Sequence, residues 1–335
     1  MKRLLTFLLL LTVYGVMAQT PSTDPHWTKN NKYSDEFNGT RNAIWRDMTD
    51  KGWGSETFRP QNIQYGTENG RQFIRFVGEM VNGTPYTGGI NTGPWTGTSL
   101  GVGYGYYEIE ARLLQTPNIV SGLWPAFWLW HYNTTPPCWY EELDIFEPSN
   151  CRVRANNHHV TFWRNPTGKC PNSIGENVLS DTGDKYNVDM SQWHKYAVEW
   201  LPERVIFYLD NEAFFVITNR ITPFRQNKNL LIDLQTMKLD NQCAPDKKYN
   251  GILGYFDVNY FRYHQLKYDC GTPVVEILNY NTYNYAVKKS ISLSGVSSLT
   301  SGQNISLRAT DFIELKNGFE VPLGAELYLD INSCE

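Results

Sequence analysis

Four carboxylates lie close together in one apolar stretch of the chain: Glu141, Glu142, Asp144 and Glu147. Side chains alternate between the two faces of a β-strand, so Glu142 and Asp144 would share a face. Glu147 has the opposite parity, but a β-bulge near Ile145 or Phe146 would bring it to the same face. Two carboxylates about 5–5.5 Å apart can serve a retaining glycosidase, one as nucleophile and the other as general acid and base. The spacing therefore permits glycoside hydrolysis if the strand is bulged, whereas a solvated strand face is the ordinary alternative.

A tryptophan-rich run precedes these carboxylates at residues 122–130, Gly-Leu-Trp-Pro-Ala-Phe-Trp-Leu-Trp. By the two-residue period of a strand, Trp124, Trp128 and Trp130 share one face and form a flat aromatic strip. Core packing is the usual role of such a strip. Beside a strand that carries carboxylates, however, we expect Trp124 and Trp128 to bind substrate, because aromatic faces stack on sugar rings.

Together the two segments resemble the centre of glycoside hydrolase family 16, which includes laminarinases, lichenases, agarases and carrageenases. The family signature, Glu-x-Asp-x-x-Glu after a Trp-Pro-x-x-Trp strand, is matched by residues 142–147 and 124–128. The resemblance implies that Glu142 is the nucleophile and that Glu147 is the acid and base. It also implies that Asp144, between them, hydrogen-bonds Glu142 and adjusts the proton balance.

The resemblance suggests substrate contacts on segments upstream of the signature. Arg59 and Asn62 lie where the family often places such contacts, although polar turn residues are an equal interpretation. Residues 84–100 are rich in Gly, Thr and Pro, which is typical of a loop that carries binding residues. Trp95 in this loop is a candidate sugar platform, and a packing tryptophan is the alternative.

Two later strands carry further candidates. Within residues 157–163, His159 and Trp163 share a face by the two-residue period. The family commonly places a His close to the carboxylates on this strand, so His159 is our candidate and His158 the alternative. In residues 230–237, the family has a cleft-facing Asn, where this chain has Asp233 or Gln235. We take Gln235 as a substrate contact.

A structural calcium ion is the one metal that the resemblance suggests. Many family members hold calcium near the opening segment and the last strand of the domain. Glu36 and Asp257 are the carboxylates of this chain that could contribute oxygen ligands there. We expect no cofactor for catalysis.

The N-terminus has the pattern of a signal peptide. A basic Met-Lys-Arg is followed by an apolar run from Leu4 to Val16 and by small residues up to Ala18. We therefore expect a cleaved signal peptide at residues 1–18 and a protein that is secreted, exposed on the cell surface or periplasmic. The apolar run is too short to span a membrane, and no later segment is apolar enough.

Composition narrows the class of protein. The 335 residues have a net charge of −4 and no basic run, which makes nucleic-acid binding improbable. Aromatic residues make up 14% of the chain, in keeping with a carbohydrate-binding surface. Six cysteines in an exported protein suggest disulfides, and a Cys270–Cys334 pair would bracket the C-terminal module. We expect a monomer.

The chain divides into two β-rich parts after the signal peptide. Short alternating strands with turn signals and no sustained helical period predict an all-β fold. The resemblance implies a two-sheet jelly-roll β-sandwich with a concave substrate cleft for residues 19–267. Residues 268–335 change character, with short alternating runs separated by Gly302, Gly318 and Gly324. We expect a small β module there, for sorting, attachment or accessory binding.

The leading hypothesis is a secreted, retaining endo-β-glycanase that hydrolyses β-1,3-glucan or mixed-linkage β-1,3/1,4-glucan. The extra Glu141 and the absence of a basic run favour this neutral substrate. An endo-hydrolase of the marine galactans agarose, porphyran or carrageenan is the alternative. Sulfated galactans need Arg or Lys in the cleft, and the candidates are Arg59, Arg112, Arg152, Arg154 and Arg164. A non-catalytic carbohydrate-binding protein and a structural surface β protein are the competing classes.

Overall fold

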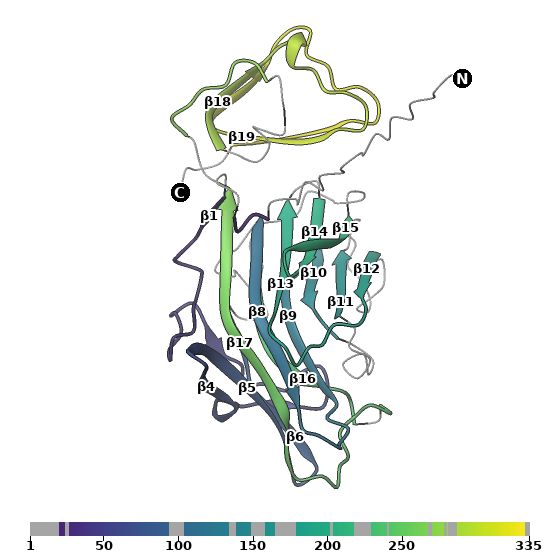
Figure 1. The fold of residues 1–335 in the computed structure, drawn as a ribbon. Coiled ribbons are helices and arrows are strands. Elements are labelled where there is room, and N and C mark those ends of the chain that lie inside the picture. Colours follow the sequence, from purple (N-terminus) through teal and green to yellow (C-terminus); the bar gives the residue numbers. More distant parts are fainter. Residues whose placement is uncertain are drawn as a thin grey trace, which may run out of the picture.

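A computed structural model of the chain describes residues 20–23, 27–93, 104–133, 139–148, 158–164, 179–201, 204–217, 229–239, 241–266, 270–277, 280 and 287–331. Within these ranges the regular structure is almost entirely β-strand (Figure 1). The two short 3-10 helices of these ranges are η1 (Pro60–Asn62) and η2 (Gly295–Ser297). The all-β fold class predicted from the sequence is confirmed.

The larger sheet of the sandwich has ten strands in the described residues, in the order β15-β14-β13-β8-β17-β5-β6-β3, with β1 beside β17 and β4 beside β5. Its strands are β1 (Trp27–Lys29), β3 (Thr57–Phe58), β4 (Ile63–Glu68), β5 (Arg71–Val81), β6 (Thr84–Thr87), β8 (Gly105–Gln115), β13 (His194–Leu201), β14 (Arg204–Leu209), β15 (Glu212–Ile217) and β17 (Gly251–Leu266). The long strands β8 and β17 pair along most of their length and form the centre of the sheet.

The second sheet has seven strands in the described residues, in the order β12-β11-β10-β9-β16-β7-β2. Its strands are β2 (Arg46–Asp47), β7 (Gly89–Asn91), β9 (Leu123–Asn133), β10 (Trp139–Phe146), β11 (His158–Arg164), β12 (Leu179–Lys185) and β16 (Asn229–Thr236). All of its paired strands are antiparallel. The tryptophan-rich run is β9 and the carboxylate strand is β10, so the two signature segments are hydrogen-bonded neighbours.

The core lies between the two sheets and is built by alternation along the strands. Phe127 and Leu129 of β9 and Leu143 of β10 are fully buried in it. Their neighbours Trp128 and Trp130 belong to a separate cluster on the other face of the seven-stranded sheet. Burial of the inward residues therefore fixes which residues face outward, and a shift of one residue would exchange the two sets.

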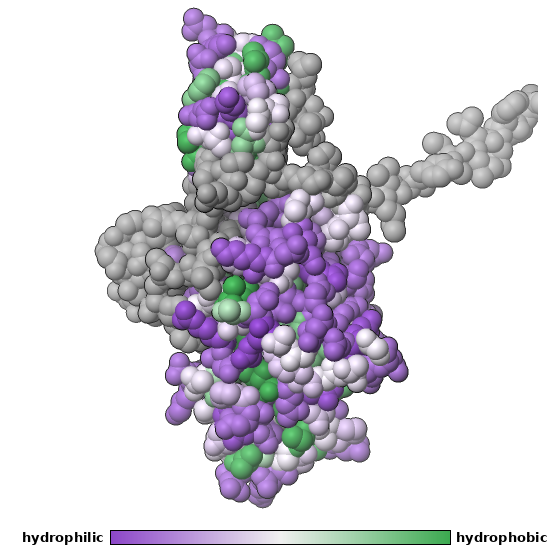
Figure 2. All heavy atoms as spheres, turned by 90° about the vertical axis from the view of Figure 1, so that its left-hand side faces the viewer, coloured by the Kyte–Doolittle hydropathy of each residue, from purple (hydrophilic) through white to green (hydrophobic). Residues whose placement is uncertain are grey.

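The C-terminal part forms a separate three-stranded sheet, β18 (Val287–Leu293), β19 (Asn304–Leu315) and β20 (Glu326–Ile331). Its neighbouring strands are parallel, and it has a small hydrophobic cluster of its own. Gly302 and Gly324 precede β19 and β20 with φ of +85° and +87°, a conformation that glycine adopts without strain. Figure 2 shows apolar residues at the surface of this module, where Leu323 is almost fully exposed.

The module lies beyond one end of the sandwich, at the end of β17 (Figure 1). The guanidinium of Arg308 in β19 sits over the ring of Tyr104, 5.3 Å from its centroid. This contact joins the module to the residue that precedes β8. The boundaries at residues 18/19 and 267/268 stay predictions, because residues 1–19 and 267–269 lie outside the described residues.

The sequence also predicts a signal peptide and disulfides, which are typical of an exported protein. The predicted signal peptide lies outside the described residues, and in the described part of the chain no helix has the length and apolarity to cross a bilayer. Cys243 and Cys270 are disulfide-bonded, and the other four cysteines lie outside the described residues. The Cys270–Cys334 pairing stays a prediction.

Candidate active site

A β-bulge in β10 brings the carboxylates to one face. Asp144 pairs with Trp128 of β9, but Phe146 pairs with Phe127, so two residues of β10 oppose one residue of β9. The bulge lies where the sequence predicts it. Glu147 follows directly after the bulge, and its backbone N–H donates to the carbonyl oxygen of His159 at 3.1 Å. The extra residue therefore corrects the parity of Glu147.

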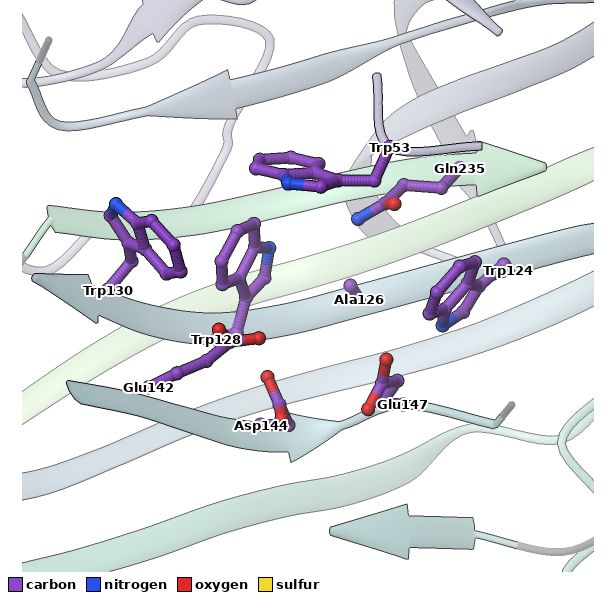
Figure 3. A pocket seen from close by; sticks show the side chains of 9 residues that line it. All are labelled: Trp53, Trp124, Ala126, Trp128, Trp130, Glu142, Asp144, Glu147 and Gln235. Carbon is purple, nitrogen blue, oxygen red and sulfur yellow. The ribbon is translucent and has the colours of Figure 1, made fainter. Parts of the chain in front are cut away.

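The three carboxylates line one pocket on the outer face of the seven-stranded sheet (Figure 3). The pocket is lined by Trp53, Trp124, Ala126, Trp128, Trp130, Glu142, Asp144, Glu147 and Gln235. In Figure 3 the carboxylates of β10 form one side, and indoles face them from β9 and from the segment that carries Trp53. Carboxylates beside aromatic rings suit a ligand that is polar at its edge and apolar on its faces.

Of the three carboxyl groups that line the pocket, that of Asp144 is almost wholly buried. Burial raises its pKa well above the usual range, and the charges of Glu142 and Glu147 raise it further. A hydrogen bond with Glu142 acts in the same direction, while a hydrogen bond from Trp163 lowers the pKa. Asp144 therefore loses its proton less readily than an exposed aspartate. Trp163, predicted as a substrate contact, touches this carboxyl group.

Trp53 was missed by the sequence reasoning. Its ring packs edge-on against Trp128, with centroids 4.9 Å apart and an interplanar angle of 76°. The segment that carries Trp53 is held to β16 by Glu56, whose buried carboxylate accepts hydrogen bonds from the backbone N–H of Thr236 at 2.9 Å and from its hydroxyl at 3.0 Å. Gly54 is required here, because a Cβ at this position would lie 1.7 Å from the carbonyl oxygen of Thr236.

Strand β16 carries Asp233 and Gln235, the two alternatives for the position where the resemblance implies a cleft-facing asparagine. Gln235, predicted as a substrate contact, lines the pocket. Asp233 lies beneath it and is fully buried, and its Oδ2 accepts a hydrogen bond of 2.8 Å from the indole N–H of Trp128. Burial is the main cause that raises the pKa of Asp233 to about 7. The sequence alone could not separate these two roles.

The two histidines of β11 point to opposite faces. His159 is on the outer face, where its Nδ1 is 2.9 Å from Asp184 and its Nε2 is 2.9 Å from the hydroxyl of Thr161. It does not line the described pocket, but it lies beside the carboxylate strand, as predicted. His158 is buried in the core against Phe146, and burial lowers its pKa to about 3.

Two predicted substrate contacts, Arg59 and Asn62, lie away from the pocket. Arg59 donates to the Oδ1 of Asn62 at 2.9 Å, and both side chains bind Glu79 of the ten-stranded sheet. Asn62 is almost fully buried. Their polar groups therefore serve internal contacts, and this placement does not support the predicted contact with substrate. Trp95 lies outside the described residues.

The carboxylates predicted to bind calcium are held by cationic side chains. Glu36 accepts hydrogen bonds from Arg262 at 2.8 and 3.0 Å and from Lys29 at 3.0 Å. Asp257 is fully buried and accepts from Arg75 at 2.6 and 2.8 Å. In the described residues no cluster of three or more His, Cys, Asp or Glu could hold a metal. The residues present therefore do not fit a calcium ion at these positions.

Comparison with known proteins places this site within a family. The model of the glycosyl hydrolases family 16 matches residues 53–242, which include both signature segments. An endo-1,3-1,4-beta-glycanase, EglC of Rhizobium meliloti, is 32% identical over 133 residues, or 40% of this chain and 24% of that protein. The match thus spans about a quarter of that relative's length. A beta-glucanase of Rhodothermus marinus is 28% identical over 271 residues, covering 70% of this chain and 85% of that protein.

The fold agrees with solved structures of the family. A Bacteroides ovatus mixed linkage glucan GH16, in complex with the G4G4G3G product, aligns with a TM-score of 0.56 and 18% identity, over 69% of this chain and 99% of that one. This likeness confirms the two-sheet jelly-roll sandwich. The family model covers more than half of the chain, and it includes the strand that carries Glu142, Asp144 and Glu147. The chain belongs to glycosyl hydrolases family 16.

Proposed function

We propose that this protein is a secreted, retaining endo-β-glycanase that hydrolyses β-1,3-glucan or mixed-linkage β-1,3/1,4-glucan. The observation that carries the proposal is that Glu142, Asp144 and Glu147 line one pocket together and face tryptophan side chains across it. The names of the curated relatives, endo-1,3-1,4-beta-glycanase and beta-glucanase, support the choice of substrate.

The mechanism follows from the positions of two carboxylates on one bulged strand. Glu142 attacks the anomeric carbon while Glu147 protonates the departing glycosidic oxygen, which forms a covalent glycosyl-enzyme intermediate. Glu147 then removes a proton from water, and this water displaces Glu142 with net retention of configuration. The buried Asp144 shares its hydrogen bond with Glu142 and so adjusts the charge of the nucleophile through the cycle.

The lining of the pocket favours a neutral glycan over a sulfated one. No Arg or Lys is among its described lining residues. Of the candidate arginines, Arg59 binds Glu79, Arg112 binds Asp257 and Arg164 binds Asp181. Arg152 and Arg154 lie outside the described residues.

Glu141 does not face the pocket, so its expected influence on the choice of substrate is wrong. Glu141 is almost fully buried, and its parity matches the inward-facing Leu143 rather than Glu142. It is therefore absent from the described pocket, and it has no part in the choice between neutral and sulfated substrates. The case for a neutral glucan rests on the indoles and on the lack of cations in the lining.

Product analysis on a substrate panel tests the proposal. The panel contains laminarin, mixed-linkage β-glucan, agarose, porphyran and carrageenan, each incubated with the wild type and with Glu142→Gln. We expect oligosaccharides from laminarin or mixed-linkage glucan with the wild type alone. Products from a galactan would replace the substrate assignment. Retained binding without products would favour the non-catalytic carbohydrate-binding protein.

A further inference from the structure

Asp233 is a buried carboxyl group directly beneath the pocket. It is fully buried among the residues of β7, β9 and β16. A Cβ added at Gly89 would lie 2.7 Å from the Cβ of Asp233 and 2.8 Å from the sulfur of Met48. The enclosure is therefore tight at the Cβ of Asp233.

Two pocket residues interact with this one carboxyl group. The Nε1–H of Trp128 on β9 donates to its Oδ2 at 2.8 Å, and the side-chain amide of Gln235 on β16 lies close enough to lower its pKa. Both Trp128 and Gln235 line the pocket, but Asp233 does not. A single buried group thus connects the side chains of two neighbouring strands at the place where substrate would bind.

A carboxyl group at this position is costly for the fold. Burial disfavours the charged form and raises the pKa to about 7, and the negative charge of Glu56 raises it further. The hydrogen bonds from Trp128 and Gln235 lower it. Met48 and Phe58, which lie close to Gly89 beside Asp233, carry no charge. An apolar side chain would fill the enclosure without this desolvation cost. What a carboxyl group adds at this position is its polar contacts with the pocket residues.

We propose that Asp233 is a positioning residue that fixes the orientations of Trp128 and Gln235 in the sugar-binding cleft. The inference rests on the proposed function for the identity of the ligand, but the two hydrogen bonds do not depend on it. Because Asp233 can lose its proton near neutral pH, the hydrogen bond to Trp128 strengthens as the carboxylate forms. Substrate binding therefore carries a titration that is separate from that of the catalytic carboxylates.

Nuclear magnetic resonance of the indole groups tests the positioning directly. The full chain is labelled with ¹⁵N-tryptophan, and Trp128→Phe assigns the Nε1–H resonance of Trp128. Between pH 5 and pH 9 we expect this resonance to shift in the wild type, with a midpoint near 7, and to stay constant in Asp233→Asn. The buried Trp200 is an internal reference. A Trp128 resonance with the same shift in the wild type and in Asp233→Asn at every pH would overturn the proposal.

Kinetics with the glucan substrate provide the second measurement. We expect Asp233→Leu to raise KM by about tenfold with a smaller change in kcat, because Trp128 and Gln235 lose a shared partner. Asp233→Asn keeps an acceptor for Trp128 and should restore KM to within about threefold at pH 5. Equal KM values for Asp233→Leu and the wild type would overturn the proposal.

Asp257→Asn is the matched control. It also alters a fully buried aspartate, but on the ten-stranded sheet and away from the pocket. We expect it to lower the melting temperature and to leave KM unchanged. An equal rise of KM in Asp257→Asn would show that Asp233 affects KM only through the stability of the fold, and this would overturn the proposal. If the wild type hydrolyses no glycan, the proposed function fails. The resonance of Trp128 still tests whether Asp233 positions this side chain.

Discussion

Glu142 and Glu147 line the same pocket although they have opposite parity along one strand. The bulge between Asp144 and Phe146 makes this possible, because two residues there oppose Phe127 alone. In a regular strand, Glu147 would point into the apolar core, where an unpaired carboxylate is strongly disfavoured. The catalytic pair thus depends on a local irregularity of the backbone.

Glu142→Gln and Glu147→Gln are each expected to lower kcat by at least about a thousandfold, because covalent and acid–base catalysis both require a carboxylate. Added azide distinguishes the two roles. With the matching alanine variants, Glu142→Ala should give the α-glycosyl azide and Glu147→Ala the β-glycosyl azide, as measured by proton nuclear magnetic resonance. The reverse pattern would exchange the roles of the two residues.

Asp144→Asn is expected to move the alkaline limb of the kcat/KM profile to lower pH. The charges of Glu142 and Glu147 raise the pKa of Asp144, and such an interaction between titrating groups is mutual. Removing one ionisable group lowers the pKa of the remaining acid. We expect kcat itself to fall about tenfold to a hundredfold with the loss of the hydrogen bond to Glu142. An unchanged alkaline limb would exclude this coupling.

Trp53→Ala is expected to raise KM by about threefold to tenfold with little change in kcat, because Trp53 contributes an aromatic surface and no ionisable group. Tyr186→Ala is the control, since Tyr186 is also an exposed aromatic residue but lies outside the pocket. Initial rates over a range of glucan concentrations separate the two parameters. If both variants behave alike, Trp53 is not a sugar platform.

His158 is expected to contribute to acid denaturation. Burial lowers its pKa to about 3 from the usual value of 6.5, so the unfolded chain binds a proton between these pH values and the folded chain does not. Stability from this residue is therefore complete above pH 6.5 and is lost as the pH falls toward 3, by an amount on the order of a few kcal/mol. Urea denaturation of His158→Phe should show a weaker pH dependence in this range.

His194 provides the control for that measurement. Its hydrogen bond with Asp210 raises its pKa, so its contribution is present below the unfolded value of 6.5 and is lost as the pH rises through the folded value. His194→Gln should therefore lower stability mainly at acidic pH, where His158→Phe improves it relative to the wild type. Parallel effects of the two substitutions would contradict both assignments.

A chelator is expected to leave the melting temperature unchanged. Arg75 and Arg112 supply the positive charge at Asp257, and Arg262 supplies it at Glu36. Asp257→Asn should instead lower the melting temperature, because it leaves two arginines without their shared carboxylate. Scanning calorimetry with EDTA and with added calcium makes the comparison. A rise in melting temperature with calcium would restore the predicted metal site.

The strands around the site could be predicted because their patterns are local. Alternation places Trp124 and Trp128 on one face, and the spacing of Glu142 and Glu147 requires a bulge. Trp53 could not be found in this way, because its place depends on the hydrogen bonds of Glu56 to β16, which is distant in the sequence. A tryptophan between Gly52 and Gly54 is the only local sign of an exposed aromatic loop.

Polar residues were harder to assign than apolar ones. Arg59 and Asn62 lie near each other in the sequence and were predicted to face substrate, yet both bind Glu79. A guanidinium or an amide makes equally good hydrogen bonds inside a protein and to a sugar, so residue type does not decide between them. The direction of strand pairing in the C-terminal module could not be predicted either, because side chains alternate in the same way in parallel and antiparallel pairs.

The parallel pairing of the C-terminal module has a consequence for its evolution. Asn304 pairs with Glu326 and Ser290 pairs with Phe312, so neighbouring strands are offset by about 22 residues. Each such unit contacts mainly the units on either side of it. Insertion or loss of one whole unit would lengthen or shorten the module by about 4.8 Å while the remaining contacts persist. The length of the module can therefore change in discrete steps of one unit.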